Sequence, residues 1–216
     1  MHVEVISGGD LTDELQRRWR EILATDPAYA SPYVCPELTA AAAAVRGDVF
    51  VGLLWEGGQI VGFFPFQRAG EEGTVVGEGV NDYQAVVVAP GVEWTAAELL
   101  RGCGLRSWSF TYLAAGQEPM RPFHRQILSC AFMDLSQGYE AWARERHAEG
   151  SSLVKDTGRR RRRLEREVGP LRFEPHTPDP AVLRRLMAWK SDQYRRTGKP
   201  DWFAIPWAAS ASTSFA

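Results

Sequence analysis

The segment KDTGRRRRRLEREVGPLRFEPH has the strongest charge pattern of the chain, because it holds five consecutive arginines. If residues 159–168 form a helix, each residue turns by about 100° from the last, so the five guanidinium groups point to every side. Leu164 and Val168 mark a narrow apolar stripe, and Arg160 or Arg161 must share it. We therefore expect at least one of these arginines to face protein or an anionic ligand.

Three uses of the arginine run remain open. They are binding to nucleic acid, binding to a phosphorylated molecule such as coenzyme A or a sugar nucleotide, and simple solvation of snorkelling side chains. Residues 1–150 hold 11 Lys and Arg against 20 Asp and Glu, whereas residues 151–216 hold 14 against 7, which gives net charges of −9 and +7. The whole chain has a net charge of −2 and a pI near 6.1, so nucleic acid is not the expected partner.

Lys190 lies on the apolar face of an expected helix. Leu183, Leu186, Met187 and Tyr194 recur at helical spacing, and Lys190 falls in the middle of their face. A lysine in that position snorkels to solvent, pairs with a buried carboxylate, or holds a phosphate or carboxylate of a ligand.

Asp82 and Tyr83 form a second candidate, in the stretch VNDYQ between two expected strands. An Asx-turn, in which the side chain binds nearby backbone, explains Asp82 without any chemistry. The alternative, as for Lys190, is a contact with a ligand.

Common catalytic and metal-binding motifs are absent from the sequence. It contains no G-x-S-x-G, no H-E-x-x-H and no P-loop, and its four histidines stand apart from one another. Cys35, Cys103 and Cys130 form no C-x-x-C, so three buried thiols are expected in place of a disulfide or a metal site. With no basic leader and no run of 18 apolar residues, neither export nor membrane spanning is expected, and the cytoplasm is the default compartment.

A β-hairpin and an amphipathic helix organise the first part of the 216-residue chain. Two β-rich runs, residues 49–55 and 59–67, flank a pair of glycines, and Pro65 should end the second run or lie at an edge. Both parities of the first run are apolar, so helices must cover both faces of the sheet. The apolar residues of LTDELQRRWREIL recur at helical spacing behind a cap at Asp10 or Thr12, which predicts a helix packed on this sheet.

The remaining elements interleave, so the order predicts the α/β class with a mixed sheet. The charge shift also predicts a boundary near Gly150. Helices are expected at residues 36–47, 95–102, 136–150 and 180–197, and short strands at residues 74–77, 85–89, 107–113, 125–133 and 171–176.

Four blocks, VGFFPFQR, NDYQ, LEREVGPLRFEPH and WKSDQYRRTGKPDWFAIPW, resemble in this order the acetyltransferase family associated with bacterial cellulose biosynthesis. That family is a branch of the GNAT superfamily and is related to the FemAB-type peptidoglycan aminoacyltransferases. The resemblance runs from about Ser31 to Trp207. It implies a GNAT-like acyl-CoA N-acyltransferase domain at residues 1–150 and the beginning of a second, incomplete GNAT-like domain at residues 151–207. The last residues are small and polar without periodicity, so a disordered tail is expected at residues 208–216.

The resemblance also implies acetyl-CoA as a co-substrate. GNAT enzymes bind its pyrophosphate through backbone N–H groups of a (Q/R)-x-x-G-x-(G/A) loop between a strand and a helix. Here VVGEGVNDYQ has two glycines but precedes an expected strand, and RGCGLR has a different spacing. No cofactor-binding residue is therefore assigned.

Three functions are compatible with these observations. The first is a shortened acetyl-CoA-dependent N- or O-acyltransferase that acts on a sugar-containing or polysaccharide precursor, with Asp82, Tyr83, Lys190 and Arg196 as the expected substrate contacts. Transfer would be direct, with a deprotonated acceptor and backbone donors on the tetrahedral oxyanion, although no base is identified and no metal is expected. The second is a non-catalytic binding or regulatory domain that keeps the first GNAT-like fold. The third is nucleic-acid binding through Arg159–Arg163.

Overall fold

The computed structural model describes residues 1–130, 133–175, 177 and 179–205. Its contacts divide the chain into two compact units. The first unit joins Met1–His124 to the chain from residue 178 onward, and the second is Arg125–Thr177.

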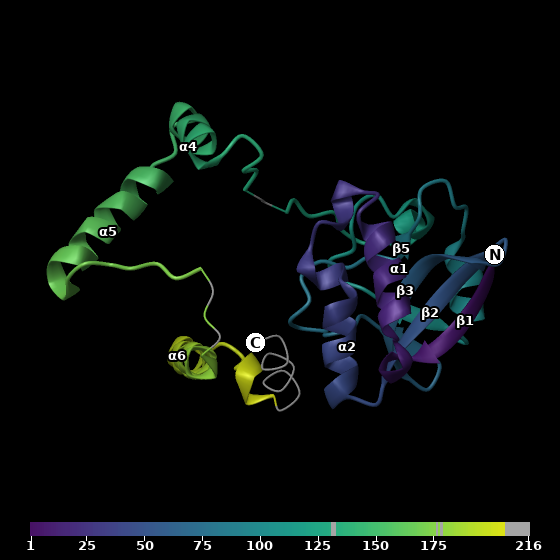
Figure 1. Cartoon of the computed structure of the whole chain (residues 1–216). Helices are drawn as coiled ribbons and strands as arrows, with labels where there is room; N and C mark the ends of the chain where they lie inside the picture. Colours follow the sequence, from purple (N-terminus) through teal and green to yellow (C-terminus); the bar gives the residue numbers. More distant parts are fainter. Residues whose placement is uncertain (131–132, 176, 178, 206–216) are drawn as a thin grey trace. The chain divides into compact units, whose positions relative to one another are not determined.

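A mixed six-stranded sheet forms the centre of the first unit (Figure 1). The strand order is β1-β2-β3-β4-β6, with β5 paired to β3. Neighbouring strands are antiparallel, except that β4 and β6 are parallel. The expected α/β class with a mixed sheet is confirmed, and it is compatible with a GNAT-like fold. The strands are β1 (His2–Ser7), β2 (Val49–Glu56), β3 (Gln59–Ala69), β4 (Glu72–Thr74), β5 (Val87–Val88) and β6 (Ser107–Ser109).

The β2–β3 hairpin is confirmed, and its turn explains why two glycines stand there. Gly57 and Gly58 both have positive φ angles, 56° and 77°, which a two-residue hairpin turn of this twist requires. Pro65 does not end β3, which continues to Ala69. On the side of β3 away from β2, Pro65 falls between the pairings with β5 and β4, so its missing N–H interrupts no ladder there.

Helices cover both faces of the sheet, as the apolar pattern of β2 predicts. The helices α1 (Asp13–Leu23) and α2 (Pro36–Val45) lie over the face shown in Figure 1, and α3 (Ala96–Gly102) packs against β1. Two clusters of buried side chains result, one on each side of the sheet. Trp19, Ile22, Val51, Phe63 and Val87 belong to the α1 side, and Leu54, Phe64, Phe66, Val88 and Leu99 to the α3 side.

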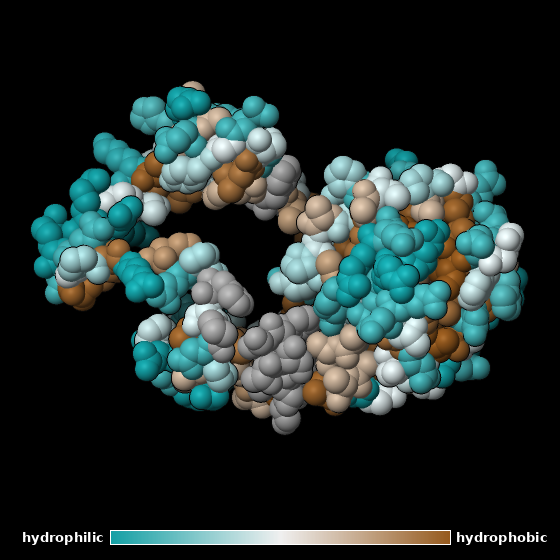
Figure 2. All heavy atoms as spheres, viewed as in Figure 1, coloured by the Kyte–Doolittle hydropathy of each residue, from teal (hydrophilic) through white to brown (hydrophobic). Residues whose placement is uncertain are grey.

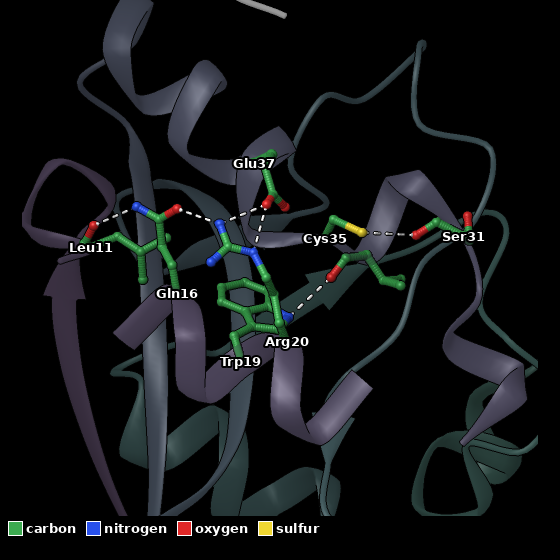
Figure 3. A network of polar contacts seen from close by, with 8 residues as sticks. Leu11, Gln16, Trp19, Arg20, Ser31, Cys35 and Glu37 are labelled. Atoms are coloured by element: carbon green, nitrogen blue, oxygen red, sulfur yellow. Dashed lines mark hydrogen bonds and ion pairs between the residues drawn. The ribbon is translucent and has the colours of Figure 1, made fainter. Parts of the chain in front are cut away.

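Trp19 anchors α1 to the sheet. Its ring stacks on Phe63 with centroids 4.7 Å apart, and its indole N–H donates to the carbonyl oxygen of Val34 at 3.0 Å. On the outer side of α1, Arg20 reaches Glu37 on α2 at 2.7 Å (Figure 3). One buried aromatic contact therefore fixes α1 to the sheet, and one exposed ion pair joins α1 to α2.

Three helices of the C-terminal part lack a packed core. They are α4 (Tyr139–Ala148), α5 (Leu153–Val168) and α6 (Pro180–Thr197), and no residue within these bounds is buried. Leu153, Leu164 and Val168 of α5 are 55%, 44% and 69% exposed. Figure 2 shows apolar side chains, in brown, at the surface of the part that holds α4 and α5. The short 3₁₀ segments are Gly8–Asp10, Pro27–Tyr29, Pro32–Val34, Glu118–Phe123 and Trp202–Ala204.

Two strand predictions are wrong. Residues 125–130 and 133 form no strand, and neither do residues 171–175. A strand needs a neighbour to pair its backbone N–H and C=O groups. Within the described part of the chain no sheet partner lies beside these segments.

The cysteine and cap predictions are only partly confirmed. Cys103 is buried as expected, but Cys35 is half-buried and Cys130 is exposed, and the three thiols are free. Ser136 does not cap α4, because Gly138 precedes the first helical residue. The expected tail at residues 208–216 lies outside the described residues.

Candidate functional site

The loop between β4 and β5, residues 75–86, holds two of the expected site residues, and buried amides fix its shape. Gln67 on β3 accepts the N–H of Gly77 at 2.8 Å through its side-chain oxygen, and its nitrogen donates to Asp48 at 3.0 Å. Asp48 is also paired with Arg46. The Arg46 guanidinium, which donates to this carboxyl, is the main cause that lowers the pKa of Asp48.

Asn81 and Gln84 continue this support at the far end of the loop. The Asn81 amide donates to the carbonyl of Val76 at 3.0 Å and accepts the N–H of Tyr83 at 3.0 Å. The oxygen of Gln84 accepts the N–H of Thr111 at 3.0 Å, and its nitrogen donates to the hydroxyl of the same residue at 3.1 Å. Asn81 and Gln84 are 6% and 3% exposed, so their backbone partners would be left unpaired without them.

These amides were not found by sequence reasoning. The expected Asx-turn exists, but Asn81 forms it and Asp82 does not. The signal that could have found them is a lone amide residue inside an apolar run, as Gln67 is in FFPFQR and Gln84 is in YQAVVV. A buried side-chain amide in such a run must find partners, and the nearest ones are backbone groups of a loop.

Asp82 and Tyr83 differ in how they are held. Asp82 is exposed on the fixed loop. Tyr83 is half-buried, and its hydroxyl donates to the carbonyl of Ala28 at 2.7 Å. Because the Tyr83 hydroxyl proton is already donated to Ala28, the exposed carboxylate of Asp82 is the more accessible polar group of the pair.

Trp202 packs on the same loop within the first unit. A Cβ atom built on Gly79 would lie 2.3 Å from the Cη2 and Cζ3 atoms of the Trp202 ring. Gly79 also has a φ of +87°, a conformation that favours glycine. The glycine therefore allows the indole ring to approach the backbone of the loop.

Lys190 and Arg196 both lie on α6, and the ends of this helix match the prediction. Asp179 caps its start and Gly198, in the left-handed conformation, ends it. Lys190 is half-buried, with its ammonium 2.9 Å from the side-chain oxygen of Gln193 and 4.9 Å from the ring centroid of Tyr194. Arg196 is exposed. No contact in the described chain joins these two cations to Asp82 or Tyr83.

The arginine run forms part of α5, which is the helical case considered from the sequence, and all five of its arginines are exposed. None of them faces protein within this unit, because the apolar stripe beside them is itself uncovered, so an anionic ligand stays as the other half of the prediction for this run. Three of the five pair with carboxylates of the same helix. These pairs are Arg159 with Asp156, Arg161 with Glu165, and Arg163 with Glu167.

Three of the four remaining cations of α5 gather on one side, whereas the fourth, Arg160, lies nearer the apolar stripe. At about 100° per residue, Lys155, Arg162 and Arg166 fall within about 40° of one another around the helix. None of these three makes an ion pair with a described residue. A stripe of positive charge thus lies opposite the apolar stripe that contains Leu164 and Val168.

Comparison with known protein families gives one match. Residues 151–212 match the family model described as the Acetyltransferase (GNAT) domain. The match spans 62 of the 216 residues, and it includes α5, α6 and Trp202. No curated protein and no solved structure matches the chain. A match to this domain indicates acyl transfer in general and an acetyltransferase type of enzyme.

The glycine turn of the 75–86 loop does not fit the pyrophosphate of coenzyme A. Gly77 already donates its N–H to Gln67, and the N–H groups of Val80 and Asn81 both donate to the carbonyl of Gly77. A phosphate cradle needs several backbone N–H groups that point outward together. This turn uses three of its N–H groups internally.

Neither a metal-ligand cluster nor a membrane-spanning helix occurs among the described residues of the chain. Among its described residues, no group of three or more His, Cys, Asp or Glu side chains is placed to hold a metal ion. A search of the same residues finds no helix with the length and apolar character needed to span a membrane.

Proposed function

We propose that the chain takes part in transfer of an acetyl group from acetyl-CoA to a hydroxyl or amino group of a sugar-containing or polysaccharide precursor. The match of residues 151–212 to the GNAT acetyltransferase domain is the observation that carries this proposal. The order of the four sequence blocks that resemble the cellulose-associated acetyltransferases supports the choice of acceptor.

Acetyl-CoA carries its acetyl group as a thioester. The acceptor oxygen or nitrogen bonds to the acetyl carbon, the C–S bond breaks, and coenzyme A leaves as a thiol that takes up the proton lost by the acceptor. The residues that contact the donor belong outside the glycine turn, since that turn does not fit a pyrophosphate. The positive side of α5, formed by Lys155, Arg162 and Arg166, lies within the matched domain and offers a phosphate three cations that make no ion pair with a described residue. We assign no catalytic base.

For the acceptor we propose Asp82, Tyr83, Lys190 and Arg196 as contacts. Asp82 suits this role because it is exposed on a loop whose backbone is held by buried amides, so its position is fixed before a ligand binds. A carboxylate binds sugar hydroxyls as a hydrogen-bond acceptor. The Tyr83 ring and the two cations of α6 offer stacking and anion contacts.

The proposal also includes the domain organisation. A GNAT-like domain covers residues 1–150, and residues 151–207 begin a second one. The uncovered apolar sides of α5 and α6 support this assignment, because helices of a folded α/β domain bury such sides against a sheet.

The decisive experiment combines calorimetric titration of the full chain with acetyl-CoA and an assay of thiol release with candidate sugars and oligosaccharides. We expect binding heat and acceptor-dependent release of coenzyme A. Asp82→Asn should raise KM for the acceptor with the calorimetric binding of acetyl-CoA unchanged, whereas Glu78→Gln, an exposed neighbour on the loop, should leave both unaltered. Absence of both heat and turnover would overturn the proposal.

A second candidate function is a non-catalytic binding or regulatory domain. It is favoured by the distribution of the core, because every buried side chain in the described residues lies within the first 120 residues. This alternative predicts that residues 1–124 resist limited proteolysis while cleavage occurs between Arg125 and Phe203. Protection through Phe203 would count against it.

A further inference from the structure

A pocket opens on the first unit, away from the 75–86 loop. It lies between α1 and the ends of β1, β2 and β3 next to the hairpin turn, and its volume is about 570 Å³. Volumes of this size are typical of pockets for small ligands. None of the residues proposed above for acetyl transfer lines it.

The floor of this pocket is an incompletely covered edge of the hydrophobic core. Ile6, Leu15, Trp55 and Ile60 line it and are each half-buried, although they pack against the buried cluster beneath α1. These side chains leave apolar surface exposed to water, and a ligand that covers this surface is favoured by the hydrophobic effect. The floor therefore favours a ligand with an apolar body.

The rim is charged, and its cations are less available than its anions. Arg18 donates to the carbonyl of Ile60 at 2.9 Å and pairs with Glu21 at 3.1 Å, so its guanidinium is occupied. Of the remaining charged residues of the rim, Glu4 and Glu14 are anionic and Arg17 is cationic. One negative charge is therefore left unbalanced at the opening.

Glu4 is placed directly beside the aromatic part of the floor. One of its carboxylate oxygens accepts the indole N–H of Trp55 at 3.0 Å. This bond joins a carboxylate to the edge of a tryptophan ring, and both residues line the pocket. A carboxylate next to an indole is a combination that holds an organic ammonium group, by charge and by cation–π attraction.

We propose that this pocket binds a small amphipathic primary amine. Its apolar body covers Leu15, Trp55 and Ile60, and its ammonium group donates to the carboxylate of Glu4 and lies near the Trp55 ring. The proposal concerns a site separate from acetyl transfer, so it holds or fails independently of that function.

The test is a titration of the full chain, labelled with ¹⁵N, with phenethylamine and with phenethyl alcohol, its neutral counterpart. The indole N–H signal of Trp55, assigned with Trp55→Phe, reports the site. We expect saturable shifts of this signal and of backbone amides in α1 and the hairpin, and about tenfold weaker binding of the alcohol.

Two matched variants separate charge from apolar contact. Glu4→Gln should weaken phenethylamine binding about tenfold and leave the alcohol unaffected. Glu56→Gln removes the same charge from the next residue beyond Trp55, outside the pocket lining, and should change binding less than twofold. Lack of saturation, equal affinity for amine and alcohol, or equal affinity of Glu4→Gln and the unmodified chain would each overturn the proposal.

Discussion

At the scale of single residues, the shape of the candidate loop depends on buried amide side chains. Gln84 is the best example, because its side chain joins the 75–86 loop to the irregular segment at residues 111–112. It accepts the N–H groups of Thr111 and Tyr112 and donates to the carbonyl of Asn81. A backbone group that is shielded from water and loses its hydrogen-bond partner lowers the stability of the folded protein.

Removal of the Gln84 amide should therefore destabilise the protein. We expect Gln84→Ala to lower the free energy of unfolding by about 2–4 kcal/mol, since it removes the partner of one buried carbonyl and of two partly buried N–H groups. Gln137→Ala, at an exposed position, should change it by less than about 0.5 kcal/mol. Urea denaturation followed by circular dichroism measures both, and equal midpoints for the two variants would contradict the role of Gln84.

Two features favour glycine at position 79: the close approach of the Trp202 ring and a positive φ angle. Gly79→Ala adds a methyl group against the Trp202 ring and strains the backbone, whereas Gly91→Ala strains a similar backbone, with a φ of +82°, in open space. Each variant should lose about 1–2 kcal/mol of stability from backbone strain. Only Gly79→Ala should move the indole N–H signal of Trp202 in an NMR spectrum, and an unmoved signal would show that the ring does not lie on the loop.

Cys103 and Cys130 should react very differently with alkylating reagents. Burial raises the pKa of Cys103 to about 12, and its side chain is 1% exposed, so both thiolate and access are lacking at pH 8. Cys130 is exposed. Mass spectrometry after brief iodoacetamide treatment of the folded protein should find Cys130 modified at least about tenfold more than Cys103, and urea should abolish the difference.

At the scale of elements, local signals at helix ends place the helices that cover the sheet. The hydroxyl oxygen of Thr95 accepts the N–H of Glu98 at the start of α3, and the Thr95 hydroxyl donates to the carboxylate of Glu98. The helix is short, and Leu99 on it is fully buried in the cluster beneath. Loss of the capping hydrogen bond should therefore also weaken the packing of Leu99 in the core.

Replacement of this cap should have a measurable cost. Thr95→Ala removes the oxygen that satisfies the first turn of α3 and should destabilise the protein by about 1 kcal/mol. Thr95→Ser keeps that oxygen and should lose less than half as much. Thermal unfolding of the two variants distinguishes them, and equal losses would mean that the methyl group of Thr95, not its oxygen, is the stabilising part.

At the scale of the whole molecule, burial divides the chain unevenly. The sheet and the helices α1 to α3 enclose the two main buried clusters, whereas α4, α5 and α6 contain no buried residue within their bounds. Isolated helices of this length are marginal in water, because their stability in proteins comes mainly from packing. The two parts should therefore differ in local stability.

Hydrogen exchange measures that difference directly. We expect backbone amides of β3 and α1 to exchange at least about a hundredfold more slowly than amides of α5, although α1 and α5 are both helical. The comparison of two helices serves as the internal control, because both have helical hydrogen bonds whereas α1 contains buried residues and α5 contains none. Protection of α5 equal to that of α1 would show that its apolar side is covered in solution.

The sequence by itself determined the local elements of this protein. The hairpin, the capped helices α1 and α6, and the mixed α/β class follow from side-chain periodicity, turn glycines and caps, which act over a few residues. The two failed strand predictions mark the limit of that reasoning, because a strand forms only where another strand satisfies its backbone.

Only the tertiary structure decided the features that join distant residues. Gln67 and Gln84 hold the 75–86 loop through hydrogen bonds to distant backbone groups, and Trp202 packs on Gly79. In the pocket beside α1, the Glu4 carboxylate accepts the indole N–H of Trp55. Such contacts depend on which backbone groups and rings come together when the chain folds. The spacing of residues along the sequence does not specify these partners. The identities of the side chains were present in the sequence, but their partners were not.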